Sequence, residues 1–428
     1  MSVKALSAAM AAILLTASVL GAAEPGPGPL GLAATLDLAR SGPDVRAARE
    51  QASEAGDAAD AHWRAAYLPK LLGGVVWEHT DRDLQMEVFP LGALDLGQDG
   101  WMGGAVAQQP ILDVESMVYG VRASRRTAQA AELKAQQAER DNQTKALGYY
   151  LQALELRAQR RALEQYARNL TARGDEIQRL YELGGVGEAD LLKVKLGADD
   201  ARAGARELAE KEDLLARLLA QTLGLEGVRT PEDLPENLPD ATAPAARPED
   251  RSDLKALGRQ IEAAEAAEAG AEADFLPKVS ASVSYVRSDQ DLLNQQEWCG
   301  LGAQATWTLF DGAVRQARAS AAAHEAAALK DKRAAALQGL AAQAHDAAAM
   351  LKIKRQEYAE RLQAVVEAER AAKLEFERLQ RGRVTMNNLI DAEDVLKDRR
   401  EKADLAKVQW WEQWFQGQAA AGAPLSLP

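Results

Sequence analysis

The sequence is short of cysteine, of aromatic side chains and of long apolar runs. Cys299 is the only cysteine, so an intramolecular disulfide is excluded, and one cysteine says little about the redox compartment. Phe, Trp and Tyr make up 5% of the 428 residues, which argues against a series of ordinary globular cores. Beyond the N-terminal segment, no stretch approaches the roughly 18 apolar residues that a membrane-spanning helix needs. We therefore expect no transmembrane helix in the mature chain.

The charge balance limits the partners and indicates the fold class. The formal net charge is −13, so the chain lacks the excess positive charge that binding to a phosphate backbone requires, and nucleic acid is excluded as an expected partner. Alanine is abundant and charged residues make up 27% of the chain. This combination of small and charged residues is typical of long helices packed side by side.

The N-terminal residues have the layout of a secretory signal peptide. Lys4 precedes an apolar run from Ala5 to Leu20, and small residues follow at Gly21 and Ala23. The run is short for a membrane anchor, and a Pro/Gly-rich stretch follows at once, so we predict export with cleavage after Ala23. The segment contains no cysteine, and nothing in it indicates a lipid anchor.

The sequence contains an internal duplication. The segment YLPK at Tyr67–Lys70 recurs as FLPK at Phe275–Lys278, and PILD at Pro110–Asp113 recurs as TLFD at Thr308–Asp311. The glycine-containing segments LGGVGEADLL and RGRVTMNNLI also correspond, and each lies at the same distance from the Asp of its own copy. The first copy is longer only between its Leu-Pro and its Asp, where a surface loop would accommodate an insertion. Self-similarity of this kind predicts two structural repeats.

Each repeat is predicted to contain a helix, two strands, a long helix, a turn and a returning helix. The helices before Pro69 and Pro277 must end there, because a residue that precedes proline is disfavoured in helical conformation. After them the apolar period changes from 3.6 to 2, as in Val279, Ala281 and Val283. The predicted segments are a signal peptide at 1–23, a first repeat at 24–229, a Pro-rich linker at 230–248, a second repeat at 249–417 and a flexible tail at 418–428. The first repeat has strands near 70–80 and 100–111, a long helix at 113–183, a tip at 184–187 and a helix at 188–223. The second repeat has strands near 278–287 and 300–309, a long helix at 311–381, a tip at 382–385 and a helix at 386–415.

The helices that follow the glycines carry an apolar seam that includes small residues and has one polar gap at Arg399. Apolar residues recur at spacings of three and four, which predicts an antiparallel coiled coil whose seam builds a shaft and performs no chemistry. The seam residues are Leu191, Val194, Ala198, Ala201, Ala205, Leu208 and Leu215 in the first repeat, and Leu389, Ala392, Leu396, Ala403, Ala406 and Trp410 in the second. The aromatic run WWEQWF at Trp410–Phe415 is expected to pack the middle of this shaft.

The strands have the length and pattern of membrane strands. About ten residues cross a bilayer when the strand is tilted, but four strands cannot close a barrel, and open edges are not tolerated in lipid. The chain must therefore borrow strands from identical copies: two copies give a filled eight-stranded barrel, and three give twelve strands and an open lumen. A membrane-interface belt is predicted from aromatic residues in or beside the strands, with an ordinary β-sandwich as the alternative: Tyr67, Trp77, Trp101, Phe275, Trp298, Trp307 and Phe310.

This order of elements, with its two Leu-Pro-Lys segments and its two glycine tips, resembles the TolC-type outer membrane efflux (outer-membrane factor) family over about residues 32–415. The resemblance implies a mainly α-helical fold with a membrane β-barrel part. Three chains would form a 12-stranded barrel, with four strands from each chain, continued by a long α-helical coiled-coil barrel. It implies a passive exit duct in the outer membrane of a Gram-negative bacterium that projects into the periplasm and serves tripartite efflux or type I secretion. The implied partners are two further copies, a periplasmic adaptor, an inner-membrane pump and outer-membrane lipid.

The resemblance also implies a gate just after the tip glycines. The matching positions are Asp190 in the first repeat and Asn388 and Asp391 in the second. Asn388 and Asp391 are three residues apart and share a helix face, and threefold symmetry would place three Asp391 carboxylates around one axis, where they would attract cations. Asp190 and Asp391 could equally be acids favoured by the first turn of a helix. The tyrosine and arginine that help lock the family's gate correspond here to Leu379 and Val384.

The tips themselves are implied to meet the adaptor. They comprise Leu183, Gly184, Gly185, Val186 and Gly187 in the first repeat, and Arg381, Gly382, Arg383, Val384 and Thr385 in the second. The glycines do not form a phosphate-binding loop, since no Lys-Ser/Thr follows them. The four histidines have no metal-ligand spacing, and we expect no metal, no cofactor and no enzymatic activity. The alternative to a duct is a periplasmic coiled-coil adaptor or scaffold without a pore, which would not need membrane-length strands.

Overall fold

The computed structural model describes residues 28–79, 84–88, 92–96, 99–184, 186–235, 238–239, 247–292 and 295–427; for 78–100 and 288–296 we describe the backbone only. The predicted signal peptide at 1–23, Gly185 of the first tip and much of the predicted linker lie outside the described residues.

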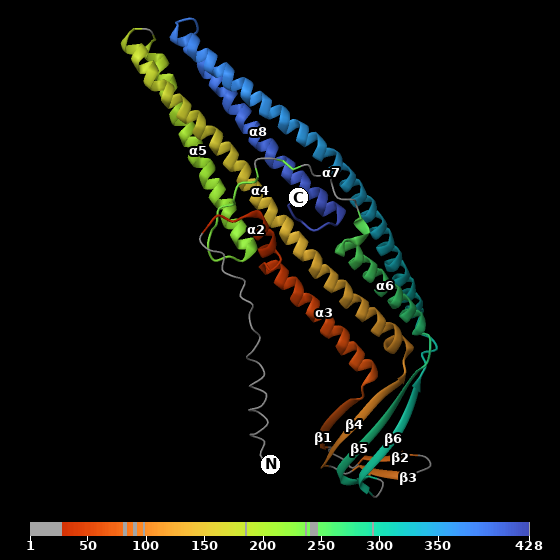
Figure 1. Cartoon of the computed structure of the whole chain (residues 1–428). Helices are drawn as coiled ribbons and strands as arrows, with labels where there is room; N and C mark the ends of the chain where they lie inside the picture. The colour runs from red at the N-terminus through yellow and green to blue at the C-terminus, as the bar shows by residue number, and fades with distance from the viewer. Residues whose placement is uncertain are drawn as a thin grey trace, which may run out of the picture.

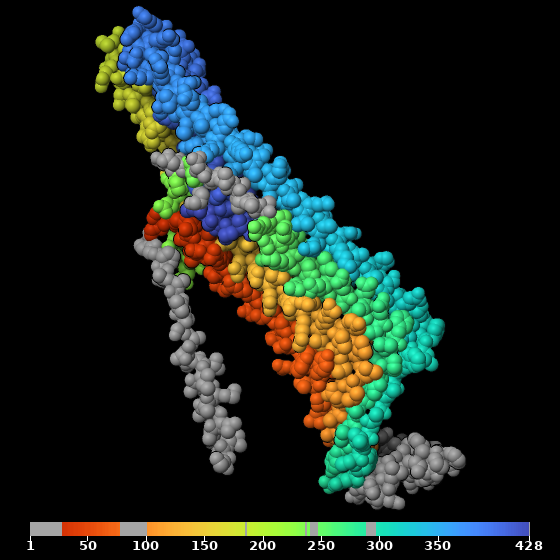
Figure 2. Space-filling model, turned by 45° about the vertical axis from the view of Figure 1, so that its right-hand side comes forward, coloured from red at the N-terminus to blue at the C-terminus, as the bar shows by residue number. Residues whose placement is uncertain are grey.

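Long helices build a rod that carries both tips at one end and a small sheet at the other (Figure 1). The two longest, α4 and α7, contain 62 and 67 residues, so each is on the order of 95 Å long at 1.5 Å per residue. The helices pack side by side along the rod (Figure 2). Their bounds are α2 Leu32–Ala39, α3 Pro43–Tyr67, α4 Val121–Glu182, α5 Glu188–Leu223, α6 Ser252–Ala273, α7 Val314–Gln380 and α8 Met386–Ala421, with short helical turns η2 at Val114–Gly120 and η3 at Pro248–Asp250. None of the described helices has the length and apolar character needed to cross a membrane.

The ends of the helices follow local sequence. α3 ends at Tyr67 because Leu68, which precedes Pro69, is extended with ψ of 145°. The first long helix was expected from residue 113, but its first seven residues form the π-helical turn η2, and Asp113 accepts a hydrogen bond from the Ser116 backbone N–H. The second long helix begins at Val314, three residues later than expected.

The main sheet has four antiparallel strands in the order β1-β4-β5-β6, so the two repeats meet at the central β4–β5 pair. The strands are β1 Lys70–His79, β4 Asp99–Leu112, β5 Lys278–Leu292 and β6 Gln295–Thr306. β6 stops three residues before the predicted end at 309. The insertion of the first repeat, predicted as a surface loop, contains a separate hairpin of β2 Leu84–Val88 and β3 Gly92–Leu96. Among the described strands, none pairs with the outer edges of β1 and β6.

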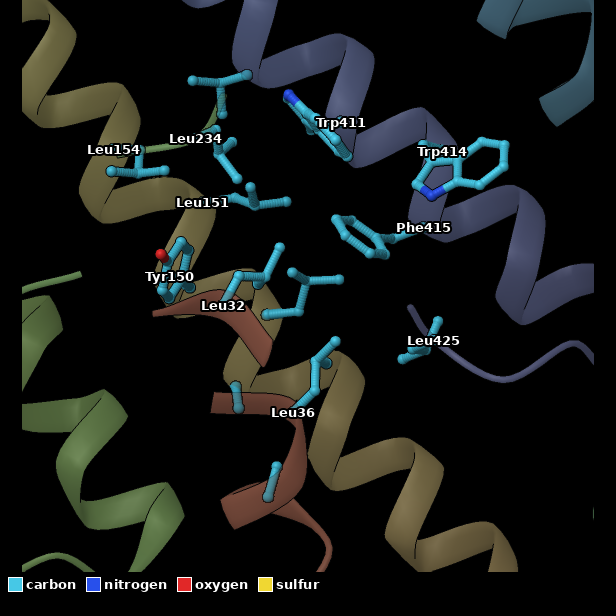
Figure 3. Packing of buried hydrophobic residues seen from close by; sticks show 14 of the residues in the cluster. Leu32, Leu36, Tyr150, Leu151, Leu154, Leu234, Trp411, Trp414, Phe415 and Leu425 are labelled. Carbon is cyan, nitrogen blue, oxygen red and sulfur yellow. The ribbon is translucent and has the colours of Figure 1, made fainter. Parts of the chain in front are cut away.

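A central core holds the middle of the rod together. In Figure 3, Leu32 and Leu36 of α2, Leu151 of α4 and Phe415 of α8 point toward one another. Trp410, Trp411 and Phe415 are each at most 2% exposed, which confirms that the WWEQWF run packs the shaft. The central core comprises Leu30, Leu32, Leu36, Ala39, Ala146, Leu147, Tyr150, Leu151, Leu154, Leu219, Leu223, Leu234, Leu351, Val408, Trp410, Trp411, Trp414, Phe415 and Leu425.

The linker and the tail both dock on this core. Leu30 and Pro231 form a parallel bridge, in which the Thr230 carbonyl accepts from the Leu30 N–H at 2.9 Å. α8 continues to Ala421, beyond the expected end at 415, and the Ser426 N–H donates to Gln418 Oε1 at 2.9 Å. Leu425 is buried. Residues 418–421 therefore continue α8, and Leu425 and Ser426 contact the shaft, where we predicted a flexible tail from residue 418.

Candidate functional site at the two hairpin tips

Each tip is a tight reversal between two helices. The first tip (residues 183–187) joins α4 to α5, and the second tip (residues 381–385) joins α7 to α8. Gly184 and Gly382 have φ of +75° and +67°, a left-handed conformation that a side chain with a Cβ rarely adopts. At the second tip the Arg383 N–H donates to the Arg378 carbonyl at 2.9 Å, which closes the end of α7. Gly184 and Gly382 are thus the residues at which the chain reverses direction.

The second tip begins α8 with a reciprocal cap. The Thr385 side chain accepts a hydrogen bond from the Asn388 backbone N–H. In return, the Thr385 backbone N–H donates to Asn388 Oδ1 at 3.2 Å. The Thr385 hydroxyl also donates to Asn388 Oδ1 at 2.6 Å. Two otherwise unpaired helix donors are thereby satisfied. Asn388, a predicted gate residue, therefore has its amide oxygen committed to the helix end.

The two predicted gate carboxylates have different surroundings. Asp190 lies half-buried in the first turn of α5, where its charge is favoured by the helix dipole. Asp391 is exposed on α8, one turn beyond Asn388, and makes no hydrogen bond or ion pair with any described residue. Within the part of the chain that the structure describes, no hydrogen bond joins Asp190 to either α8 residue. Inside one chain, Asn388 and Asp391 thus lie one turn apart on α8, and Asp190 lies on α5 of the other hairpin.

A compact tip core fixes both tips on four helices. It comprises Tyr166, Ala167, Leu170, Ile177, Leu191, Val194, Ala198, Ala201, Phe376, Leu379, Met386 and Leu389. Leu379 is 6% exposed, and Val384 packs against the same core. These two positions, where the family resemblance implied a polar lock, contribute apolar packing here. The contact between hairpins is supplemented at the surface by Lys193 Nζ, which donates to Asn387 Oδ1 at 3.2 Å, and by Gln380, which donates to Glu176 at 3.1 Å.

A buried carboxylate below the tips was missed by the sequence analysis. Glu393 is 1% exposed, and its Oε2 accepts from Asn169 Nδ2 at 2.8 Å. Arg173 Nε lies 3.5 Å from the other carboxylate oxygen, and its guanidinium stacks on the Phe376 ring at 3.7 Å. The group joins α4, α7 and α8. The sequence feature that could have identified Glu393 is its position between Leu389 and Leu396, on the apolar seam, because a charge at a buried position must be paired.

The neighbouring Tyr166 extends this contact along α4 and α8. Burial, together with a hydrogen bond to Asp394 and its charge, raises the pKa of Tyr166 well above its ordinary value. Lys397 lies 5.0 Å from the ring. Two consecutive turns of α4 are thus joined to α8 by polar side chains, one through Glu393 and one through Tyr166.

A second ionic cluster binds the linker to the shaft. Arg157, 10% exposed, lies 2.7 Å from Glu212 of α5 and 3.1 Å from Asp233 of the linker. Its Nη1 also donates to the Pro231 carbonyl at 2.7 Å, and Arg161 contacts Asp233 at 2.5 Å. Burial alone would raise the pKa of Asp233, but the hydrogen bonds from Arg161 and Arg157 outweigh it and lower that pKa below its ordinary value. We call Arg157, Arg161, Glu212 and Asp233 the linker clamp.

The junction between the sheet and the rod is also ionic. Lys278, at the start of β5, contacts Asp274 at 2.9 Å, Glu115 in a shorter pair, and Asp113 at 4.0 Å. Arg315 is buried; it contacts Asp311 at 2.9 Å, and its guanidinium donates to the carbonyls of Asp274 and Thr308 at 3.2 and 2.6 Å. Thus Asp311 of TLFD binds the first turn of α7, and Asp113 of PILD lies between the start of β5 and the turn η2.

The predicted interface aromatics lie on the strands or where these meet the rod. Trp77 and Trp101 are opposite one another in the β1–β4 register and are 68% and 38% exposed. Trp307 and Phe310 are 60% and 86% exposed. The Tyr67 hydroxyl donates to the Met117 carbonyl at 2.6 Å, the Trp307 Nε1–H donates to the Phe275 carbonyl at 3.0 Å, and Trp298 is half-buried on β6. Such exposed rings at the sheet end are consistent with an apolar environment there.

No group of His, Cys, Asp or Glu side chains in the residues that the structure describes is arranged to hold a metal ion. The groove between α4 and α5 has a volume of about 820 Å³ and is lined by alternating Arg and acidic side chains with alanines, such as Arg202, Asp199 and Ala205. It is an open surface groove of the first hairpin.

The comparisons with known proteins agree with this architecture. Residues 248–423 match the family described as outer membrane efflux protein. The outer membrane protein VceC of Vibrio cholerae superposes with a TM-score of 0.79 at 17% identity, covering 92% of this chain and 97% of that chain. The outer-membrane channel OprN superposes at 0.80 with 18% identity, over 92% and 90% of the two chains. The outer membrane channel CmeC of Campylobacter jejuni superposes at 0.79 with 15% identity, over 91% and 85%.

No curated protein matches the sequence. The family match covers the second repeat, and the fold of the solved channels extends over both repeats. The matched family and the solved structures are channels rather than enzymes. The second repeat thus resembles the outer membrane efflux protein family in sequence, and the whole chain has the fold of the solved outer membrane channels.

Proposed function

We propose that this chain is one subunit of a homotrimeric duct through the outer membrane of a Gram-negative bacterium. The duct is a passive exit path of a tripartite efflux or type I secretion system, and its shaft projects into the periplasm. The observation that carries the proposal is the four-stranded antiparallel sheet, with both outer edges free of strands within the described chain, at the end of a helical rod.

The free edges support association in a membrane. A strand edge in lipid leaves backbone N–H and C=O groups unpaired at several kcal/mol each, so only a closed barrel is stable there. Three copies supply twelve strands, which enclose an open lumen, whereas two copies supply eight strands and a filled interior. The exposed rings at the sheet end, Trp77 and Phe310 among them, fit an interfacial belt.

The tips are proposed to meet a periplasmic adaptor, which in turn contacts an inner-membrane pump. Leu183 is 83% exposed at the first tip, and Arg381 and Arg383 are exposed at the second. Both tips lie at the end of the rod farthest from the sheet (Figure 1). An exposed apolar side chain on one tip and two exposed cations on the other suit a partner with apolar and acidic residues.

Asp190, Asn388 and Asp391 are proposed to line the entrance. The exposed, unpaired Asp391 carboxylate supports a ring role most directly, because threefold symmetry would place three of them around one axis. Asn388 contributes by setting the start of α8, since its amide oxygen caps the helix. The duct needs no catalytic group, because the pump supplies the energy.

The test of the duct combines fractionation and conductance. We expect the protein in the outer-membrane fraction, three chains per particle in detergent, and discrete single-channel conductance in planar bilayers. A detergent-independent soluble monomer without conductance would refute the duct and favour the alternative, a periplasmic adaptor or scaffold without a pore.

Docking at the tips is tested separately by site-specific photo-crosslinking in cells. A photoreactive side chain at Leu183 or Arg383 should capture the adaptor, whereas the same group at Glu50, an exposed residue of α3, should not. Equal capture from all three positions would contradict docking at the tips.

A further inference from the structure

We infer the residue register in which β6 of one copy pairs with β1 of the next copy, and we infer that residues 307–310 become part of β6 through this pairing. The inference rests on the proposed function, because it needs copies of the chain to associate. It specifies which backbone positions close the sheet, a detail that the proposed function leaves open.

The first step is that equivalent residues of the two repeats are paired in the same way in the sheet. Tyr67–Lys70 corresponds to Phe275–Lys278, and Pro110–Asp113 corresponds to Thr308–Asp311. Under this correspondence the β1–β4 pair of Lys70 and Gln108 becomes Lys278 and Thr306, which is the pair found in β5–β6. The pair of Trp77 and Trp101 likewise becomes Tyr285 and Cys299, which are also opposite one another. The two hairpins therefore have the same register.

The second step uses the pairing between the repeats. β4 is the second strand of the first repeat, and it pairs with β5, the first strand of the second repeat. The equivalent pairing is β6 with β1, which one chain cannot make because these are the two outer strands of its sheet. Transferring Ala107–Val283 gives Ala305 opposite Val75 of the next copy. Transferring Ala105–Tyr285 gives Ala303 opposite Trp77.

The third step explains why β6 is shorter than β4. β1 pairs with β4 only as far as Gln108, yet β4 continues to Leu112 because β5 pairs along its other side. β6 ends at Thr306, where its pairing with β5 ends, and its other side has no strand among the described residues. The four residues equivalent to 109–112 are 307–310, and they lie in no strand. The missing neighbour accounts for the missing strand.

The exposed side chains of this segment fit the same explanation. Trp307, Leu309 and Phe310 are 60%, 79% and 86% exposed in the single chain. Transferring the pair of Gln109 and Ala281 places Trp307 opposite Gly73 of the next copy. A second copy thus completes the backbone pairing of this segment and places a strand beside Trp307, so the occupant of the edge is another copy of this chain.

Disulfide trapping tests the register. All variants carry Cys299→Ser, which removes the native cysteine. Val75→Cys combined with Ala305→Cys places two thiols at directly opposed positions, within the Cα separation of about 7 Å that a disulfide allows. Leu71→Cys with Ala305→Cys is the offset control, because four residues along a strand add about 13 Å. Ala107→Cys with Val283→Cys is the equivalent pair inside one chain and reports whether the oxidation works.

In membranes treated with a mild oxidant, we expect the 75/305 pair to form covalent dimers and trimers. We expect about tenfold less from the 71/305 pair, since only the first pair satisfies disulfide geometry. The 107/283 pair should close within a single chain. Trimeric, conducting protein in which 107/283 closes but 75/305 does not would overturn the register while the duct stands. A soluble monomer would overturn the duct and, with it, the register.

Hydrogen exchange on the unsubstituted protein gives a second test that does not depend on the variants folding. The backbone amides of residues 307–310 that point toward the neighbouring copy should be as protected in the assembled protein as the amides of the equivalent segment 109–112, in which Pro110 has no amide hydrogen. They should lose protection by at least about tenfold when the copies are dissociated, since exchange follows local opening. Exchange at 307–310 that is equally fast in both states would overturn the inference.

Discussion

Single buried polar side chains decide how the tip end of the rod is held. Glu393 occupies a seam position between two leucines, yet it is paired with Asn169 and Arg173. A buried pair of this kind adds little net stability over an apolar pair, but removing one partner leaves a charge buried without compensation. These residues therefore contribute specificity of packing, because α4, α7 and α8 must keep the relative positions in which the Glu393 carboxylate is paired.

Removing the cation from this group should cost more than removing both charges. Arg173→Met leaves the Glu393 carboxylate buried and unpaired, and it should lower the free energy of unfolding by about 3 kcal/mol at neutral pH. The double variant Arg173→Met/Glu393→Gln should recover most of that loss. Chemical unfolding of the detergent-solubilised protein, followed by circular dichroism, measures both, and simple additivity of the single changes would contradict the pairing.

The exposed Asp391 should act through its charge and not through folding. If three of these carboxylates face one axis, Asp391→Asn should weaken block by multivalent cations in planar bilayers while leaving thermal stability unchanged. Asp398→Asn is the matched control, because Asp398 lies on the same helix but pairs with Lys402 at 2.9 Å. Unchanged block in Asp391→Asn would refute the ring.

The sequence predicts apolar packing positions well and buried charges poorly. Leu191, Val194 and Leu389 follow a helical period, and all are buried as expected. Glu393 and Glu212 lie on equally buried positions, but a charged residue in a helix is ordinarily assigned to the solvent face. Their partners Arg157 and Asn169 come from other helices, so the pairing depends on tertiary structure that no local pattern contains.

At the scale of elements, the repeat determines the strand register but not the contacts around it. Lys278 is held by Asp274, Glu115 and Asp113. The corresponding residues around Lys70 are Ala66, Ala313 and Asp311, and Asp311 already pairs with Arg315. The junction inside the chain is thus richer in carboxylates than the equivalent junction to a second copy.

Local pattern also misses elements that have no periodicity of their own. The π-helical turn η2 reads as ordinary helix because its residues are helix-compatible, and the β2–β3 hairpin lies in the insertion that one repeat lacks. The tail is held to the last turns of α8 by a hydrogen bond between Gln418 and Ser426, both polar residues that suggest exposure. In each case a contact from elsewhere in the chain, or a comparison with the other repeat, is needed to find the element.

The linker clamp should make part of the stability depend on pH. The folded-state pKa of Asp233 is below its ordinary value, so the stability it contributes is fully present above about pH 4 and is lost as the pH falls through the lower folded pKa. Because Asp233 is about half-exposed, the contribution should be roughly 1 kcal/mol or less.

We therefore expect Asp233→Asn to lower the thermal midpoint at pH 7 and to match the unsubstituted protein at the acidic limit. Asp199→Asn, which removes an exposed pair with Arg202 at 2.7 Å, should change little at any pH. A difference for Asp233→Asn that stays constant from pH 7 to pH 3 would contradict the role of its charge.

At the scale of the whole molecule, one core serves both repeats. The central core takes α2 and α4 from the first repeat, α8 from the second, and residues of the linker and the tail (Figure 3). Trp410 stacks with Trp414 at 6.2 Å and meets Trp411 edge-on at 5.1 Å. Because the two repeats share these side chains, neither repeat should fold fully without the other.

Truncation of this core should therefore weaken the whole chain. Trp411→Ala should lower the free energy of unfolding by about 4 kcal/mol, because it leaves a cavity among residues of both repeats. Trp411→Phe should cost less than half as much, since it keeps most of the ring and removes an indole N–H that has no partner among the described residues. Unfolding midpoints in urea test the pair of variants, and equal losses would argue against a cavity as the cause.

The free strand edges have a cost before assembly is complete. An unpaired edge flanked by exposed Trp307, Leu309 and Phe310 can pair with any strand it meets, including strands of unrelated chains. Correct closure depends on meeting copies of the same chain, so it is a concentration-dependent race against aggregation. The same edges that would seal the barrel thus make the unassembled subunit prone to aggregation.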